Sequence, residues 1–203
     1  MIKRTKRAGC LPDLCVFPGG TAHNVDFSSD WLKLFGATCP ESAQIRFGFA
    51  KTVCKTAPML YRLRDPEYSE VPSEVAFRIC AVRETFQETG VLLARSADVA
   101  TFQFNPNAVE AYSFGEEHIK NVEEWRLKVR KDPYEFIKLC KTLDIVPDIW
   151  SLYDWSNWLS PADACKADCK RLDAAFYVCC LTKCPYTSED CNEMEMVRSH
   201  VRN

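Results

Sequence analysis

The segment from residue 73 to residue 90 constrains the fold more than any other part of this sequence. Its apolar residues recur every three or four positions and share one side of a helix: Val75, Ile79, Val82 and Phe86. Ser73 is expected to cap the start of this helix, because a serine oxygen accepts from the first free amides. Gly90 is expected to end it, because glycine tolerates a left-handed backbone. The apolar run at 91–94 then predicts a strand.

The polar side of the predicted helix carries Glu84, Gln87 and Glu88. Positions i, i+3 and i+4 lie on one face, so two carboxylates and an amide are directed at one point. Hard divalent cations such as Mg²⁺ bind oxygen ligands of this kind together with substrate phosphates, and they activate water for attack on phosphorus. The face therefore predicts hydrolysis of a diphosphate, with Glu84 and Glu88 as ligands and one of them as base. A Glu pair alone is more typical of a solvated helix surface.

The full string around these residues favours the site over the surface. RETFQETGV, at 83–91, resembles the signature R-E-U-x-E-E-x-G-U of the Nudix hydrolases, in which U is a bulky aliphatic residue. Thr85 departs from the signature at an aliphatic position, and Gln87 departs from it at a glutamate. Glutamine keeps an oxygen ligand but has no charge, so we expect weaker metal binding and reduced activity. The matching positions are Arg83, Glu84, Glu88, Gly90 and Val91.

An insertion divides the signature into two parts, and this insertion indicates one subgroup of the family. Its leading glycine corresponds to Gly20, at the end of FPGG, and an insertion over about 21–72 separates this glycine from Arg83. Such an insertion resembles one subgroup, the acyl-coenzyme A diphosphatases of the nucleoside diphosphate-linked moiety X motif 19 type. The resemblance covers nearly the whole chain. Further matches are DFSSDWL at 26–32, WSNWLSP at 155–161 and RLDAAF at 171–176.

The resemblance implies an α/β fold, namely a Nudix-type α/β/α sandwich with a mixed sheet, formed as a single domain over 1–203. It implies dependence on Mg²⁺ or Mn²⁺ and hydrolysis of coenzyme A or acyl-coenzyme A to adenosine 3′,5′-bisphosphate and a 4′-phosphopantetheine. Arg83 would support the helix through a salt bridge. Gly19 and Gly20 would let a loop pass close to the metal, because glycine permits close backbone approach. The ligand set it implies is Glu84, Gln87 and Glu88.

The resemblance also implies two further acidic residues, which this sequence does not place uniquely. One should precede the signature arginine, and Glu74 is the nearest candidate, although it stands one position out of register. The other should come from a later loop, where Glu193 and Glu195 are the candidates. The chain resembles a subgroup member truncated at both ends. We expect such a chain to expose a sheet edge and apolar surface and to be less stable.

Two other functions remain open at this point. The helix recognises a diphosphate but not the groups that flank it. The first alternative is therefore a Nudix hydrolase whose substrate is ADP-ribose or NADH. Gln87 and the missing segments also allow a catalytically weak relative that acts as a binding module.

Charge and hydropathy limit the partners. Twenty-six Lys and Arg against 28 Asp and Glu leave a net charge of −2, which gives no basic field for nucleic acid or an anionic membrane. The apolar run at 174–181 is far shorter than the roughly 20 residues of a membrane span. The basic start of the chain lacks the apolar core of a secretion signal. We therefore expect an intracellular protein acting on a small nucleotide-type molecule. The resemblance implies the peroxisome or the mitochondrion, although no address is visible.

Twelve cysteines invite a disulfide scaffold, a zinc site or plain thiols. Disulfide scaffolds are usually small and secreted, so thiols are the better expectation for this long chain. A structural zinc site is the weaker alternative, because two cysteines of the densest cluster lie in an apolar run, where one of them is expected to pack as a small hydrophobe. That cluster is Cys165, Cys169, Cys179, Cys180, Cys184 and Cys191.

A helical and aromatic segment follows at about 115–161. Apolar spacing predicts one helix to residue 131 and another after Asp132-Pro133. We expect the aromatic residues that come next to form a packed corner, since large rings dominate core burial. The alternative is a platform for an adenine ring or an acyl chain. These residues are Trp150, Tyr153, Trp155 and Trp158.

Overall fold

The structure is a computed structural model, and it describes residues 2–4, 13–36, 58–97, 113–114, 122–160, 172–181 and 196–199. The first half of the chain contains β1 (Ile2–Arg4), β2 (Cys15–Val16), η1 (Asn24–Phe27), α1 (Asp30–Leu34), α3 (Pro58–Tyr61), η2 (Pro66–Tyr68), α4 (Ser73–Thr89) and β3 (Leu92–Ser96). The second half contains β4 (Ser113–Phe114), α5 (Val122–Lys131), α6 (Glu135–Leu143), β5 (Ile145–Pro147), η4 (Ile149–Ser151), β6 (Tyr153–Leu159), β7 (Asp173–Val178) and β8 (Met196–Ser199).

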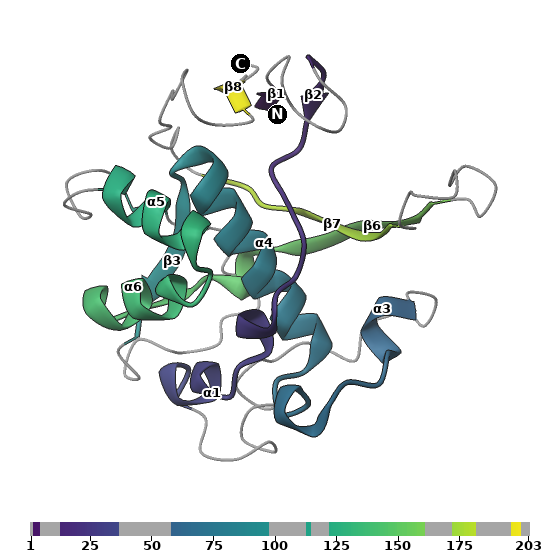
Figure 1. Cartoon of the computed structure of the whole chain (residues 1–203), viewed down its shortest axis with the longest axis vertical. Coiled ribbons are helices and arrows are strands. Elements are labelled where there is room, and N and C mark those ends of the chain that lie inside the picture. The colour runs from purple at the N-terminus through teal and green to yellow at the C-terminus, as the bar shows by residue number, and fades with distance from the viewer. Residues whose placement is uncertain are drawn as a thin grey trace.

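Helix α4 runs through the middle of the molecule, with α5 and α6 to one side of it and α1 below (Figure 1). Its predicted apolar stripe is in the core, where no residue of the stripe is more than 1% exposed. Burying each such side chain contributes about 1.5–3 kcal/mol, which explains why this helix organises the fold. Gly90 ends the helix at φ 76°, as predicted. The stripe is Val75, Ile79, Val82 and Phe86.

The start of α4 differs from the prediction. Pro72 occupies the cap position, and no side chain caps the helix. Ser73 is instead the first helical residue, and its Oγ accepts a hydrogen bond from the Arg64 guanidinium. The Arg64 guanidinium also lies over the ring of Phe27, 4.1 Å from its centroid. A tertiary partner has thus taken the serine oxygen that local sequence reasoning assigned to the cap.

Strand β3 is central to its sheet, in the order β4-β3-β5. Leu92, Leu93 and Ala94 are all buried, which is typical of a strand covered on both faces. A second sheet has the order β2-β1-β8, with Ile2 opposite Val16. All strand pairs between described residues are antiparallel. The predicted α/β class is confirmed, whereas the mixed sheet stays a prediction.

The described part of the insertion at 21–72 is not a separate appendage. Val25, Trp31 and Phe35 are buried in the same core cluster as α4 and β3. This part of the chain also forms the short helix α1, and the Trp31 ring lies 5.8 Å from that of Phe136 in α6. The single domain over 1–203 stays a prediction.

The expected aromatic corner is wrong for three of its four residues. Trp150 does pack inward, with its ring 5.7 Å from that of Phe35. Tyr153, Trp155 and Trp158 are 43%, 73% and 68% exposed. They lie on the β6–β7 hairpin, which extends away from the helices (Figure 1). Ring size predicts burial only where a second layer covers the strand, and this hairpin projects outward.

The cysteine predictions are tested only where the structure describes the residues. Cys15, Cys80, Cys140, Cys179 and Cys180 are free thiols. Cys179 packs against the core as expected, and burial raises its thiol pKa to about 12. The other candidates of the zinc cluster and the distal acid lie outside the described residues: Cys165, Cys169, Cys184, Cys191, Glu193 and Glu195. None of the helices in the described ranges is long and apolar enough to cross a membrane.

Candidate functional site

The polar face of α4 gathers its three predicted residues in one place. Glu84 is only 5% exposed, and its Oε2 accepts a hydrogen bond of 2.7 Å from Nε2 of Gln87. Glu88 follows one helical turn after Glu84 and is half-buried. The two carboxylates thus differ in access, because water reaches Glu88 more easily than Glu84.

The chain after β2 returns along this face and brings both predicted glycines to it. The amide of Gly19 donates to Oε2 of Glu88 at 2.7 Å. Gly20 lies so close to the other carboxylate that a Cβ at this position would stand 2.3 Å from Oε2 of Glu84. Close approach therefore requires glycine at position 20, whereas nothing lies within 4 Å of a Cβ built at position 19.

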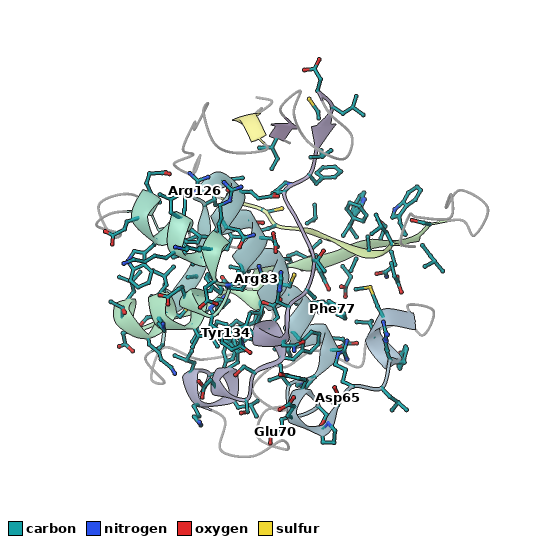
Figure 2. The ribbon with its side chains drawn as sticks, viewed as in Figure 1. Asp65, Glu70, Phe77, Arg83, Arg126 and Tyr134 are labelled. Atoms are coloured by element: carbon teal, nitrogen blue, oxygen red, sulfur yellow. The ribbon has the colours of Figure 1, made fainter. Side chains whose placement is uncertain are left out.

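Arg83 fixes the orientation of the Glu84 and Gln87 side chains through hydrogen bonds. Its guanidinium is fully buried and forms a two-pronged ion pair with Asp26, in which Nε donates to Oδ1 and Nη2 to Oδ2, both at 2.8 Å. Nη1 donates to Oε1 of Glu84 at 2.6 Å and to Oε1 of Gln87 at 3.3 Å. Burial alone would lower the pKa of Arg83, but the bonds and charge of Asp26 outweigh burial and raise it. Figure 2 shows Arg83 at the middle of α4.

Asp26 is therefore the acidic partner that sequence reasoning missed. It comes from η1, is fully buried, and its Oδ2 also accepts the amide of His23 at 2.8 Å. Glu74, the nearest candidate in sequence, lies ten residues before Glu84, which is about 15 Å along the helix. The available signal was the matching stretch that begins at Asp26, six positions after Gly20.

Arg126 of α5 is a second residue that sequence reasoning missed. It is fully buried, and its Nη2 donates to the carbonyl oxygens of Gln87 and Glu88 at 3.3 and 2.9 Å. Its Nη1 is held by both oxygens of Glu123 at 2.9 Å. Carbonyls in the last turn of a helix lack intrahelical partners, so a cation there satisfies them and opposes the helix dipole. In Figure 2, Arg126 lies beside the carboxyl-terminal end of α4.

The two carboxylates of this face fit a divalent cation that also binds water and phosphate oxygens. Glu84 and Glu88 supply two carboxylates, and within the described ranges no third His, Cys, Asp or Glu joins them. Mg²⁺-type sites commonly use one or two carboxylates and complete their shell with water and phosphate oxygens. The oxygen of Gln87 accepts from Arg83 and its nitrogen donates to Glu84, while its role as a metal ligand stays a prediction. Gln87 thus acts here as a bridge between those two side chains.

Gly20→Ala tests the close approach. The added methyl would overlap the carboxylate of Glu84, which Arg83 and Gln87 hold in place. We expect a loss of about 1–3 kcal/mol in the free energy of unfolding, typical of overpacking. We also expect about tenfold weaker Mn²⁺ binding, as for disturbed support of a metal ligand. Urea denaturation and calorimetric titration measure the two effects. Unchanged values in both would show that the loop stands farther from Glu84.

Known proteins resemble the chain in both sequence and fold. A family model described as the NUDT19 Nudix domain matches residues 1–201. The acyl-coenzyme A diphosphatases NUDT19 of Xenopus laevis, Gallus gallus and Homo sapiens are 37%, 40% and 36% identical over 194, 200 and 199 residues. These matches cover 96%, 95% and 96% of this chain but 50%, 51% and 50% of those proteins, so the chain spans about half the length of these relatives.

The fold comparison agrees with the family match. The crystal structure of a NUDIX hydrolase from Alicyclobacillus acidocaldarius superposes with a TM-score of 0.52 at 18% sequence identity. The superposition covers 92% of this chain and 64% of that one. At this identity the likeness speaks for the fold alone, and it confirms the Nudix-type architecture.

Proposed function

This chain belongs to the NUDT19 Nudix domain family, and from that premise we propose that it hydrolyses the diphosphate bond of coenzyme A or acyl-coenzyme A. The products would be adenosine 3′,5′-bisphosphate and a 4′-phosphopantetheine. The observation that carries the proposal is the pair of carboxylates, Glu84 and Glu88, on one face of α4 with the Gly19-Gly20 loop against them.

Each residue of the face has a distinct role in this proposal. Glu84 and Glu88 would hold a divalent cation, Mg²⁺ or Mn²⁺, which when bound neutralises the diphosphate and lowers the pKa of water. Glu88 is the more accessible carboxylate and would accept the proton of the attacking water. Arg83 fixes the direction of the Glu84 carboxylate through its 2.6 Å bond. Gly20 supplies the space into which the carboxylate of Glu84 fits.

Incubation with three substrates tests the proposal and its alternatives. Purified protein with Mn²⁺ is given coenzyme A, ADP-ribose and NADH, and the products are resolved by chromatography. We expect adenosine 3′,5′-bisphosphate and 4′-phosphopantetheine from coenzyme A. Cleavage of ADP-ribose or NADH alone would reject the substrate but keep the reaction. No cleavage of any of them would favour a binding module.

Gln87→Glu addresses the weak-enzyme alternative. The change replaces the hydrogen bond from Nε2 to Glu84 with two facing carboxylates, which repel each other unless a cation lies between them. We expect a lower melting temperature without metal, a larger rise on adding Mn²⁺, and about tenfold tighter Mn²⁺ binding, because affinity follows ligand charge. Thermal denaturation over a Mn²⁺ series measures this, with Gln87→Met as the uncharged control. Equal Mn²⁺ responses in the two variants would place residue 87 away from the ion.

The compartment is proposed from the resemblance alone. We place the protein in the peroxisome or the mitochondrion, where fractionation of cells that express it should recover it. Recovery in the cytosol would reject this part of the proposal.

A further inference from the structure

Several aromatic side chains share one face of the β6–β7 hairpin. The ladder pairs Ser156 with Phe176 and Trp158 with Ala174. Directly opposed residues, and residues two apart on a strand, point to the same side. Phe176 and Trp158 therefore lie together, and Tyr153, which pairs with Val178, lies on the same side as both.

The opposite face of the hairpin is the one that turns toward α4. Asp154 pairs with Tyr177 on that face. Arg78 of α4 donates to Oδ2 of Asp154 at 2.8 Å and lies 5.0 Å from the ring centroid of Tyr177. The face with Tyr153, Trp158 and Phe176 is thus directed away from Arg78.

Phe17 joins this outward face from a distant part of the chain. Its ring stands edge-on to that of Phe176, with centroids 6.0 Å apart and planes at 76°. Phe17 remains 62% exposed in spite of this contact. We call Phe17, Tyr153, Trp158 and Phe176 the aromatic platform.

Phe17 also connects the aromatic platform to the carboxylates of α4. It stands two residues before Gly19, whose amide donates to Glu88 at 2.7 Å. Two residues of extended chain span at most about 7 Å. In Figure 1 the same segment runs down from β2 across the view of α4, where the β6–β7 hairpin meets the helix. The distance from Phe17 to the site proposed to hold the diphosphate is therefore short enough for one nucleotide to contact both.

The shape of the platform indicates what it binds. Nε1 of Trp158 donates to Oγ of Ser156 at 3.1 Å, so the indole lies back along its own strand while 68% of the residue stays exposed. Such open, flat rings on a sheet stack the planar bases of nucleotides. An acyl chain would instead need a concave apolar pocket that encloses it.

We propose that the aromatic platform stacks the adenine base of the coenzyme A substrate. This inference rests on the proposed function, because it takes the diphosphate to lie at Glu84 and Glu88. Phe17 is the residue nearest the carboxylates, and Trp158 extends the stacking surface outward along β6. The platform thereby selects an adenine nucleotide on one side of the diphosphate.

Binding of two small probes tests the aromatic platform without turnover. Calorimetry in Mn²⁺ buffer compares 5′-AMP with ribose 5-phosphate, which lacks only the base. We expect 5′-AMP to bind at least about tenfold more tightly, and Phe17→Ala or Trp158→Ala to remove about tenfold of this preference. Phe17→Tyr and Trp158→Phe keep an aromatic ring, so these variants should retain the preference for 5′-AMP. The controls are Leu14→Ala and Leu159→Ala, which remove exposed apolar side chains outside the platform.

The outcomes separate this inference from the proposed function. Equal binding of the two probes, or a preference that survives both alanine variants, overturns the aromatic platform. Hydrolysis of coenzyme A with an unchanged KM in both alanine variants does the same, while leaving the proposed function in place. A preference for 5′-AMP that depends on Phe17 and Trp158, in a protein that does not cleave coenzyme A, keeps the platform and rejects the proposed function.

Discussion

Asp26→Ala is expected to lower the free energy of unfolding by about 3–5 kcal/mol, the cost of removing one partner from a buried ion pair. Both side chains of the pair are 0% exposed, and two bonds of 2.8 Å join them. Without Asp26, the Arg83 guanidinium would stay charged in the core with only part of its hydrogen bonds. Urea denaturation followed by circular dichroism measures the loss.

Asp30→Ala is the matched control for this prediction. Asp30 lies four residues later in the same segment and pairs with Lys33 at 3.0 Å, but the two side chains are 38% and 76% exposed. An exposed pair contributes about 0–1 kcal/mol, so this variant should stay near the wild type. A loss for Asp26→Ala as small as that for Asp30→Ala would contradict the assigned role of the buried pair. Asp26→Ala should also weaken Mn²⁺ binding, because Arg83 orients Glu84.

The parts of this fold that the sequence predicts are those coded locally. Val75 and Phe86 belong to one periodic apolar stripe, and Gly90 favours the end of a helix. The sequence of this segment alone therefore predicts α4. Asp26 is not readable in this way, since it meets Arg83 across 57 positions of sequence. Arg126 is not predictable from the local sequence either, because it contacts the end of α4 from another helix. Side chains that support the site therefore depend on tertiary contacts that no spacing rule encodes.

The errors have the same physical origin. Ser73 has the right residue type for a cap, but Arg64 engages its oxygen. Trp158 has the right size for a core, but its strand extends away from the helices. Gln87 is not among these errors: its role as a metal ligand stays a prediction, and its amide bonds to Arg83 and Glu84 within the same helix. For Ser73 and Trp158, a partner outside the helix, or the lack of a covering layer over that strand in the described structure, decides what the side chain does.

Glu88→Gln is expected to reduce metal-dependent turnover by about 10²–10³-fold, since the stabilisation that a bound cation supplies is several kcal/mol. The substitution keeps the size of the side chain and an oxygen that accepts from the amide of Gly19, so the loop and helix should stay in place. What it removes is one negative charge at the ion and the proposed base for water. The rate of coenzyme A hydrolysis over a Mn²⁺ series measures the loss.

Glu74→Gln separates this effect from a general weakening of α4. It makes the same chemical change on the same helix, ten residues before Glu84 and about 15 Å away along the axis. Turnover should stay within about twofold of the wild type, because a change this far from the reacting phosphate touches neither ligand nor base. Full activity in Glu88→Gln would mean that Glu88 is neither ligand nor base. Equal losses in the two variants would trace both to the stability of the helix.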